Sequence, residues 1–310
     1  MHLERIVLAT DFSAAARLAL EHAVAIATRF QARLYIFHAI DVRDGGSQGN
    51  ESLADDFYEL TERRAREELE GLRARLGPPG VHTGPISIVE TVRIGSPSEE
   101  IVAFAEEKEA DLVVVGTQGR SVLARVFAGS VAESVLRRAP CPVLAVRVPD
   151  GAAPPAAPPS LSRILCAVDH SASSRAALRA SCDLADRFES EVVAVTVVDD
   201  YLVSQGPIDA VALDTRFIEI ARENLERCVQ ETVGGKCGRG IRRRVEAGRP
   251  AESIARVAEV EGASLIACGT HGRSGIARAL FGSVAEKIVR IAPCPVLTVR
   301  EGKPAARLAA

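Results

Sequence analysis

Short apolar runs bounded by polar residues alternate along the chain with segments whose apolar residues recur at helical spacing. In the first half of the chain the runs predict strands at 6–9, 34–40, 86–92, 112–115 and 142–146. The helical spacing predicts helices at 13–29, 51–76, 97–108 and 130–138. This alternation predicts an α/β fold with a mostly parallel sheet, helices on both faces and right-handed crossovers.

The same pattern occurs twice, because the sequence of the first half returns in the second. The segment IVLATDFS at 6–13 returns as ILCAVDHS at 164–171, and the longest match pairs 116–147 with 269–300. Between the copies lies PDGAAPPAAPPS, whose Pro and Ala content indicates a semi-rigid linker. We therefore predict two tandem, doubly wound domains with five-stranded parallel sheets, at 1–148 and 161–301, joined by a linker at 149–160.

Helix starts and chain punctuation refine these boundaries. Ser13 is positioned to cap the first helix. Ser96, Pro97 and Glu99 form the pattern of a capping box with proline at the first helical position. Ser130 opens a similar capping-box pattern, Ser-x-x-Glu.

Composition narrows the classes of partner. The net charge of −3 gives no reason to expect a nucleic acid or a membrane surface. The one basic run, 242–244, is interpreted as a charged edge strand in preference to a binding patch. Seven cysteines without CxxC spacing indicate reduced thiols. With no signal peptide pattern and no apolar run long enough to span a bilayer, we expect a cytoplasmic protein.

Ligands of open parallel sheets bind beyond the carboxyl ends of the strands, so the residues that follow each strand are the candidates. Asp11 follows the first strand. After the fourth strand the sequence reads Gly-x2-Gly-x9-Gly-Ser, with an arginine after the second glycine, and both copies carry this spacing. In the first copy these residues are Gly116, Gly119, Arg120, Gly129 and Ser130.

This pattern suits a phosphate-bearing ligand. Glycines allow a ligand to approach main-chain N–H groups, and successive N–H groups form an anion-binding concavity. Gly129 and Ser130 open a helix, whose N-terminus favours an anion, and Arg120 adds a positive charge. Asp11, across the crevice, suits a ribose hydroxyl or a base edge. Each residue also has a purely structural explanation: Ser130 as a helix cap, Asp11 as an acceptor for the next helix, and the glycines as turns.

With these motifs the sequence resembles the universal stress protein family, in its tandem two-domain form and its ATP-binding branch. The resemblance covers nearly the whole chain except the linker and the last residues. It implies the adenine nucleotide alpha-hydrolase-like fold with strand order 3-2-1-4-5, and Ala9 and Ala39 in an adenine pocket. It implies ATP, with Mg²⁺ or Mn²⁺ accompanying the nucleotide, and a homodimer and regulatory protein partners as further associations. It also implies that the final strands, 142–146 and 295–299, pair within one chain.

The positions implied to contact the nucleotide extend over both copies. In the first copy they are Ala9, Asp11, Ala39, Gly95, Gly116, Gly119, Arg120, Gly129, Ser130 and Val131. In the second copy they are Ala167, Asp169, Val197, Gly248, Gly269, Gly272, Arg273, Gly282, Ser283 and Val284. Between the first two glycines the copies differ, with Gln118 in one and His271 in the other, so the pockets need not be equal.

The sequence contains neither a GxxxxGK[ST] phosphate loop nor a GxGxxG after the first strand. His22 and His38 lie in apolar stretches that favour core roles, and Cys141 and Cys294 are interpreted as buried small residues. No catalytic set emerges. The hypotheses are an ATP-binding stress-response regulator, a slow ATPase or an enzyme of AMP-containing substrates, and an interaction protein that binds no nucleotide.

Overall fold

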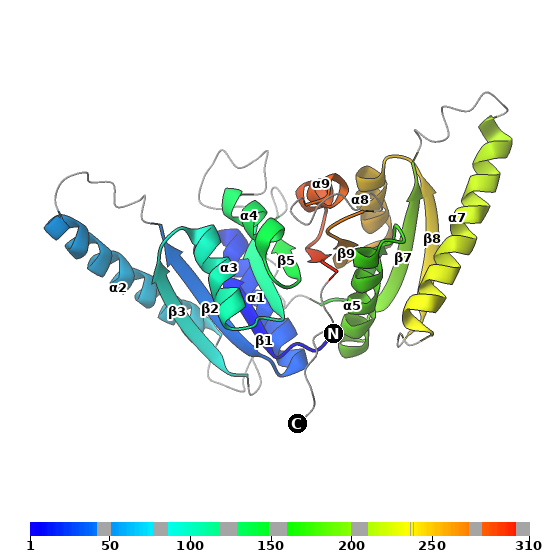
Figure 1. Ribbon diagram of the computed structural model, residues 1–310. Coiled ribbons are helices and arrows are strands. Elements are labelled where there is room, and N and C mark those ends of the chain that lie inside the picture. The colour runs from blue at the N-terminus through cyan, green and yellow to red at the C-terminus, as the bar shows by residue number, and fades with distance from the viewer. Residues whose placement is uncertain are drawn as a thin grey trace. The chain divides into compact units, whose positions relative to one another are not determined.

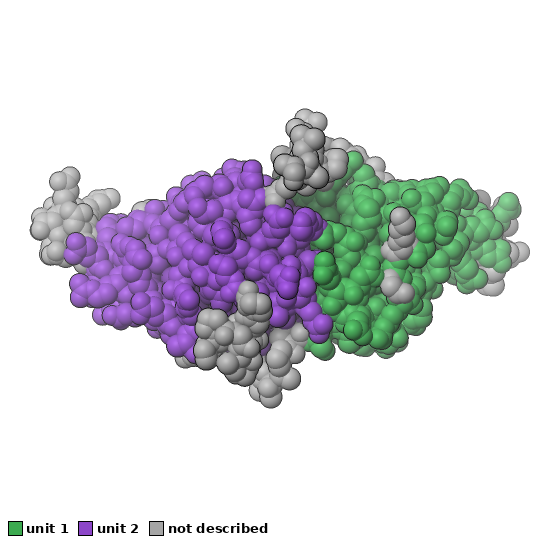
Figure 2. Space-filling model, turned by 90° about the horizontal axis from the view of Figure 1, so that it is seen from below, with its two compact units in different colours: residues 1, 160–310 green, residues 2–159 purple. Residues whose placement is uncertain are grey.

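The computed structural model describes residues 1–41, 51–76, 86–117, 129–148, 160–199, 210–235, 237, 239–272 and 281–301. The chain divides into two compact units, residues 2–159 and residues 160–310 with Met1, which Figure 2 colours separately and which we call the first and second domain. The predicted linker lies outside the described residues except for Ser160.

Both domains alternate strands and helices, as predicted (Figure 1). The first contains β1 (Arg5–Ala9), α1 (Ala14–Phe30), β2 (Arg33–Ile40), α2 (Glu51–Arg75), β3 (Ile88–Ile94), α3 (Pro97–Glu107), β4 (Leu112–Gly116), α4 (Ser130–Arg138) and β5 (Val143–Val146). The second contains β6 (Arg163–Ala167), α5 (Ala172–Phe188), β7 (Glu191–Val198), α7 (Ala210–Val233), β8 (Ile241–Ala247), α8 (Pro250–Glu261), β9 (Leu265–Gly269), α9 (Ser283–Ile291) and β10 (Val296–Val299).

The strands of each domain pair in the order expected from the family resemblance. The first domain reads β3-β2-β1-β4-β5 and the second β8-β7-β6-β9-β10, and the strand pairs are parallel. Because the order reverses between β1 and β4, right-handed crossovers place α1 and α2 on one face and α3 and α4 on the other. The packing of α3 on α4, and of α8 on α9, agrees with this arrangement.

Burial follows from this two-layer covering. The central strands β1 and β4 expose almost nothing, with Ile6, Val7, Leu8, Val113 and Val114 at 0% relative exposure. A strand covered on both faces has no polar alternation, which is why the sequence of β4 is a continuous apolar run. The central strands are therefore rigidly held, and their carboxyl ends present a fixed platform for the loops that follow.

The helix starts depart from the predictions in two places. Ser13 caps α1 as predicted, because its side chain accepts from the amide of Ala16. Ser96 occupies the N-cap position of α3 and Pro97 its first turn, but Ser96 makes no side-chain capping hydrogen bond. The capping box at Ser130 is wrong: Gly129 is the N-cap of α4, and Ser130 is already the first helical residue.

The third strand begins two residues later than predicted, at Ile88 instead of residue 86. It also ends two residues later, at Ile94 instead of residue 92, because the polar Arg93 does not end the strand. The partner strand decides the limits, since β3 pairs with β2 from Leu34–Ile88 to Ile40–Ile94. Edge strands, which have one partner, take their length from that partner.

The basic run at 242–244 lies on β8, the edge strand of its domain, as predicted. All three arginines form ion pairs: Arg242 with Glu261, Arg243 with Glu226, and Arg244 with both Glu246 and Glu261. Charges on an edge discourage pairing with another chain, and here acidic neighbours balance them. The hydrogen-bonded arginines Arg242 and Arg244 lower the pKa of Glu261, which keeps this carboxylate ionised.

Candidate functional site

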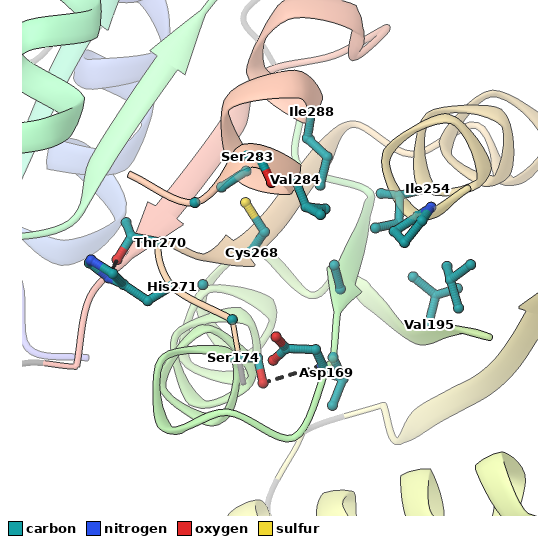
Figure 3. Close-up of a pocket in the computed structure, with 18 of the residues that line it drawn as sticks. Asp169, Ser174, Val195, Ile254, Cys268, Thr270, His271, Ser283, Val284 and Ile288 are labelled. Atoms are coloured by element: carbon teal, nitrogen blue, oxygen red, sulfur yellow. Dashed lines mark hydrogen bonds between the residues drawn. The ribbon is translucent and has the colours of Figure 1, made fainter. Parts of the chain in front are cut away.

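A cavity of about 370 Å³ lies at the carboxyl ends of β6, β7 and β9 in the second domain (Figure 3). These strands include the point where the strand order reverses, between β6 and β9, which is where open α/β sheets bind ligands. Apolar side chains from β7, α8 and α9, including Val195, Ile254 and Ile288, form part of the wall. Polar groups enter from the loops that follow β6 and β9.

Eight of the second-domain positions that the sequence singled out line this cavity: Ala167, Asp169, Val197, Gly269, Gly272, Gly282, Ser283 and Val284. Gly248 is not among the lining residues, although Pro250, at the start of α8, is. Arg273 lies outside the described residues. The fold therefore brings four separate segments of the sequence to one cavity.

Asp169 is held in place by the start of α5. Its Oδ1 accepts from the amide of Ser171 at 3.0 Å and from the hydroxyl of Ser171 at 2.5 Å. Its Oδ2 faces Gly272, where an added Cβ would lie 3.2 Å from this oxygen. The carboxylate thus serves the local turn with one oxygen and borders the cavity with the other, so the structural and the ligand-binding interpretations of this residue are compatible.

A backbone hydrogen bond joins the loop after β9, which contains the first two glycines of the pattern, to the third glycine at the start of α9. The amide of Gly282, the N-cap of α9, donates to the carbonyl of Thr270 at 2.8 Å. A Cβ on Gly282 would lie 3.0 Å from this carbonyl oxygen, a tighter approach than side chains usually make, so glycine favours this close contact. The first domain repeats the bond from Gly129 to Thr117 at 2.8 Å. A helix N-terminus, with its free amides, is consequently fixed beside the loop after β9.

Gly269 and Gly116 have a packing role as well. A Cβ on Gly269 would lie 2.7 Å from the amide nitrogen of Ser174, and one on Gly116 would lie 2.8 Å from that of Ala16. The end of β9 therefore touches the backbone at the start of α5, and the end of β4 touches that of α1. These glycines are needed by the fold itself, whatever the cavity holds.

His271 points away from the cavity-facing carboxylate of Asp169 in Figure 3. Its Nδ1 lies 2.9 Å from the hydroxyl of Thr270. Its Nε2 is buried and has no hydrogen-bond partner among the described residues. His271 therefore contributes to the cavity mainly through its backbone. Its imidazole is turned away from Asp169, and Nε2 makes no hydrogen bond within the described part of the chain.

The first domain places the equivalent residues in the same way where they are described. Ala9 is buried, Ala39 is half-buried, and Asp11 accepts from the amide of Ser13 at 3.0 Å. Gly95 donates to the carbonyl of Ile40. Ser130 and Val131 lie in the first turn of α4. Gln118, Gly119 and Arg120 lie outside the described residues.

The turn after each aspartate contains a residue with positive φ, Phe12 at 63° and His170 at 68°. Non-glycine residues rarely adopt this conformation, and such strain concentrates at functional sites. Sequence reasoning did not identify these positions, because neither Phe nor His marks a left-handed turn. The strained residue, which lies between the aspartate and the capping serine, turns the chain so that the carboxylate accepts from the serine amide.

Several further residues that line the cavity were not predicted from the sequence. Val195 and Asp199 lie two residues either side of Val197 on or after β7, and the alternation of a strand puts them on its face. Cys268 and Ser174 also line the cavity. Strand periodicity could have found the first pair, whereas Ser174 required knowing how closely α5 approaches β9.

The other chemically interesting residues lie in structural environments. His22 is buried on α1, and this burial lowers its pKa to about 4. The prediction that Cys141 and Cys294 are buried is wrong, since both cysteines are partly exposed. Burial nevertheless raises the pKa of the Cys294 thiol to about 12. Among the helices that the structure describes, none is both long and apolar enough to cross a membrane.

Comparison with known proteins gives the family. The model of the universal stress protein family matches residues 2–147 and 161–300. A universal stress protein of Mycobacterium tuberculosis is 30% identical over 251 residues, which cover 80% of this chain and 75% of that protein. One of Methanocaldococcus jannaschii is 37% identical over 148 residues, 47% of this chain and 83% of the relative.

The fold also matches a solved structure over nearly its full length. A universal stress protein of Archaeoglobus fulgidus aligns with 97% of this chain and 100% of its own, at 20% identity and a TM-score of 0.68. That likeness concerns the fold, and the two matched segments supply the assignment. The chain belongs to the universal stress protein family, with two tandem domains of that family.

Proposed function

We propose that the chain binds an ATP-type adenine nucleotide, one in each domain, and acts as a nucleotide-dependent regulator in a stress response. The observation that carries the proposal is the cavity of the second domain. It brings Asp169, the segment 269–272 and the N-terminus of α9 to one space of about 370 Å³. This volume is within the range of small-molecule sites, which combine apolar walls with a few polar groups.

The lining suggests how a nucleotide would be held. The apolar walls at Ala167 and Val197 suit the adenine base, and Asp169 suits a ribose hydroxyl. The backbone of Gly269 and Gly272 would hold ribose and phosphates, and Gly282, Ser283 and Val284 would receive phosphates at the start of α9. A Cβ at Gly269 or Gly282 would meet neighbouring backbone, so these glycines let the end of β9, the start of α5 and the start of α9 come close together beside the cavity.

A divalent cation would enter with the nucleotide. Within the described ranges no group of three or more His, Cys, Asp or Glu side chains could hold a metal ion. Phosphate oxygens would therefore supply most of the ligands of Mg²⁺ or Mn²⁺, as is usual for Mg²⁺ in nucleotide sites. The role of the chain is to position the phosphates, with the cation neutralising their charge.

The first domain is proposed to bind its own nucleotide by equivalence. Ala9, Asp11 and Ala39 match the base and ribose positions, and Gly129, Ser130 and Val131 match the phosphate positions. Its Gly116 and Gly129 have the same backbone surroundings as their counterparts. A whole-chain homodimer and regulatory protein partners remain part of this proposal, since a regulator must pass its occupancy to another molecule.

The first experiment identifies the bound molecule. Freshly purified protein is denatured and the released small molecules are quantified by mass spectrometry. We expect an adenine nucleotide at up to two per chain. A preparation without nucleotide that also takes up none when ATP and magnesium are added would refute the proposal and favour an interaction protein that binds no nucleotide.

A second experiment locates the sites. Replacing Gly129 or Gly282 by valine introduces a side chain at the N-cap of α4 or α9. Each single variant should lose one of the two ATP equivalents, and the double variant both. Unchanged affinity in the double variant would show that the nucleotide is elsewhere. Hydrolysis that disappears in an Asp11→Ala, Asp169→Ala double variant would instead identify a slow ATPase.

A further inference from the structure

The second domain contains a set of hydroxyl groups that ties the loop after β9 to the start of α5. Ser173 donates to the carbonyl of His271 at 2.6 Å. The hydroxyl of Ser171 lies 3.2 Å from the same carbonyl and 2.5 Å from Oδ1 of Asp169. These contacts join residues about 100 positions apart in the sequence, at the edge of the candidate nucleotide site.

The number of hydroxyl protons shows which of the two serines donates to the carbonyl of His271. A serine hydroxyl has one proton to donate. The proton of Ser171 goes to the Asp169 carboxylate, because that contact is the shorter and the acceptor is charged. Ser173 is then the hydroxyl that holds the carbonyl of His271. Through that bond it fixes the peptide between His271 and Gly272, which carries the amide of Gly272 at the cavity.

The bond is shielded from water. Ser173 has 3% relative exposure, and its hydroxyl fills the space between α5 and the end of β9. A Cβ on Gly269 would lie only 2.4 Å from this hydroxyl. Removal of the hydroxyl would leave a buried carbonyl without its partner, and the loop would regain freedom that nucleotide binding must then restrict.

The first domain lacks this device. Ala15 and Ala16 stand where the second domain has Ser173 and Ser174, as the repeated segments 6–20 and 164–178 show. An alanine side chain cannot donate a hydrogen bond. Ser13 is retained and caps α1, so the difference concerns the tie to the loop and leaves the helix cap intact.

We propose that Ser173 is a positioning residue for the nucleotide loop and makes the second domain the tighter of the two nucleotide sites. The inference rests on the proposed function. A preorganised loop loses less freedom when the ligand binds, and this difference appears as affinity. The chain therefore has two unequal sites, the second filling at lower nucleotide concentration than the first.

The test measures each site in a background where the other is blocked. Calorimetric titration of the Gly129→Val protein with ATP and magnesium reports the second site, and that of Gly282→Val reports the first. We expect the second site to bind more tightly. Adding Ser173→Ala to the Gly129→Val protein should weaken ATP binding about tenfold, the size of one lost hydrogen bond to a fixed carbonyl.

A matched control lies on the same helix. Ser181→Ala removes a fully buried hydroxyl of α5 that bonds the carbonyl of Ala177, away from the cavity, and should leave ATP affinity unchanged. Adenosine lacks the phosphates that the loop is proposed to hold. Ser173→Ala should therefore weaken adenosine binding less than ATP binding, whereas a general loosening of the fold would weaken both equally. Equal affinities of the two sites, an effect below twofold, or equal losses for adenosine and ATP would overturn the inference. Absence of all nucleotide binding would instead refute the proposed function.

Discussion

At the scale of single residues, the first two glycines of the Gly-x2-Gly-x9-Gly-Ser pattern have different roles. Gly269 must be glycine because the strand end touches the backbone of α5, where an added Cβ would lie 2.7 Å from the amide of Ser174. Among the described residues, a Cβ on Gly272 would meet only the Oδ2 of Asp169 within 4 Å, and the distance of 3.2 Å is a milder approach. The fold therefore demands the first glycine, whereas the second is explained better by a ligand.

This difference predicts opposite outcomes for two substitutions. Gly269→Ala should lower the free energy of unfolding by about 1–3 kcal/mol, the cost of overpacking against rigid backbone. Gly272→Val should change it by less than about 1 kcal/mol, as a partly open position does, while removing ATP binding at the second site. Urea unfolding combined with titration separates the two effects. A Gly272→Val protein that binds ATP normally would argue against the cavity as the site.

The buried histidine predicts a pH dependence. The folded pKa of His22 is about 4 and its ordinary value is 6.5, with burial as the cause. Between these values the unfolded chain binds a proton that the folded chain does not, so stability falls as the pH falls from 6.5 to about 4. The loss is about 3 kcal/mol at the lower end.

The second domain supplies the control substitution, since Ala180 stands where the first domain has His22. Urea unfolding of His22→Ala should show a shallower decline of stability between pH 6.5 and about 4 than the original chain. An identical decline in both proteins would assign the acid sensitivity to other groups. The variant also loses packing volume, which lowers stability equally at every pH and leaves the slope as the informative quantity.

At the scale of elements, the helix starts show that similar sequences can cap differently. Ser13 accepts from the amide of Ala16 at 3.1 Å, whereas Ser96 makes no capping bond. Ser13→Ala should therefore cost about 1 kcal/mol of stability, and Ser96→Ala a few tenths at most. Denaturant unfolding of the two variants side by side measures the contrast, and equal costs would contradict the capping assignment.

The sequence predicted the elements and their order more fully than their chemistry. Repeated apolar runs identified the strands because central parallel strands carry no polar residues, as β4 shows. The glycine spacing located the loop after β9, because positions where backbone segments approach closely favour glycine, and glycine is visible in the sequence. The role of Ser173 could not be predicted, because it depends on a hydrogen bond to a carbonyl about 100 residues away, which no local sequence pattern indicates. The same holds for the strained Phe12 and for Ser130, whose capping box pattern the helix does not use.

At the scale of the whole molecule, the cysteines are distributed unevenly. Cys166, Cys182, Cys228, Cys237 and Cys268 are buried in the second domain, and all seven cysteines are thiols and not disulfides. Burial raises the pKa of Cys166 and of Cys268 to about 12, so these thiols are poor nucleophiles at neutral pH. Burial is the largest cause of both pKa shifts, and nearby groups, including Asp169 beside Cys268, add to it.

A thiol reagent should therefore distinguish native from unfolded protein. In native conditions at neutral pH we expect Cys141, which is partly exposed, to react first, and the five buried thiols to react only through unfolding. Peptide mapping after timed labelling identifies the order, with a sample in denaturant as the reference for full reaction. Early labelling of Cys166 or Cys268 would show that the second domain opens locally.

The parallel pairing of the central strands has a consequence for synthesis. Ile6 of β1 pairs with Leu112 of β4, so the innermost strand cannot complete its pairing until the ribosome has made most of the first domain. At about 5–20 residues per second the nascent chain spends several seconds with this strand half-paired. The equivalent strand of the second domain, β9, is made later still, after residue 264. Vectorial translation thus gives the first sheet time to close before a competing copy of its own strand emerges.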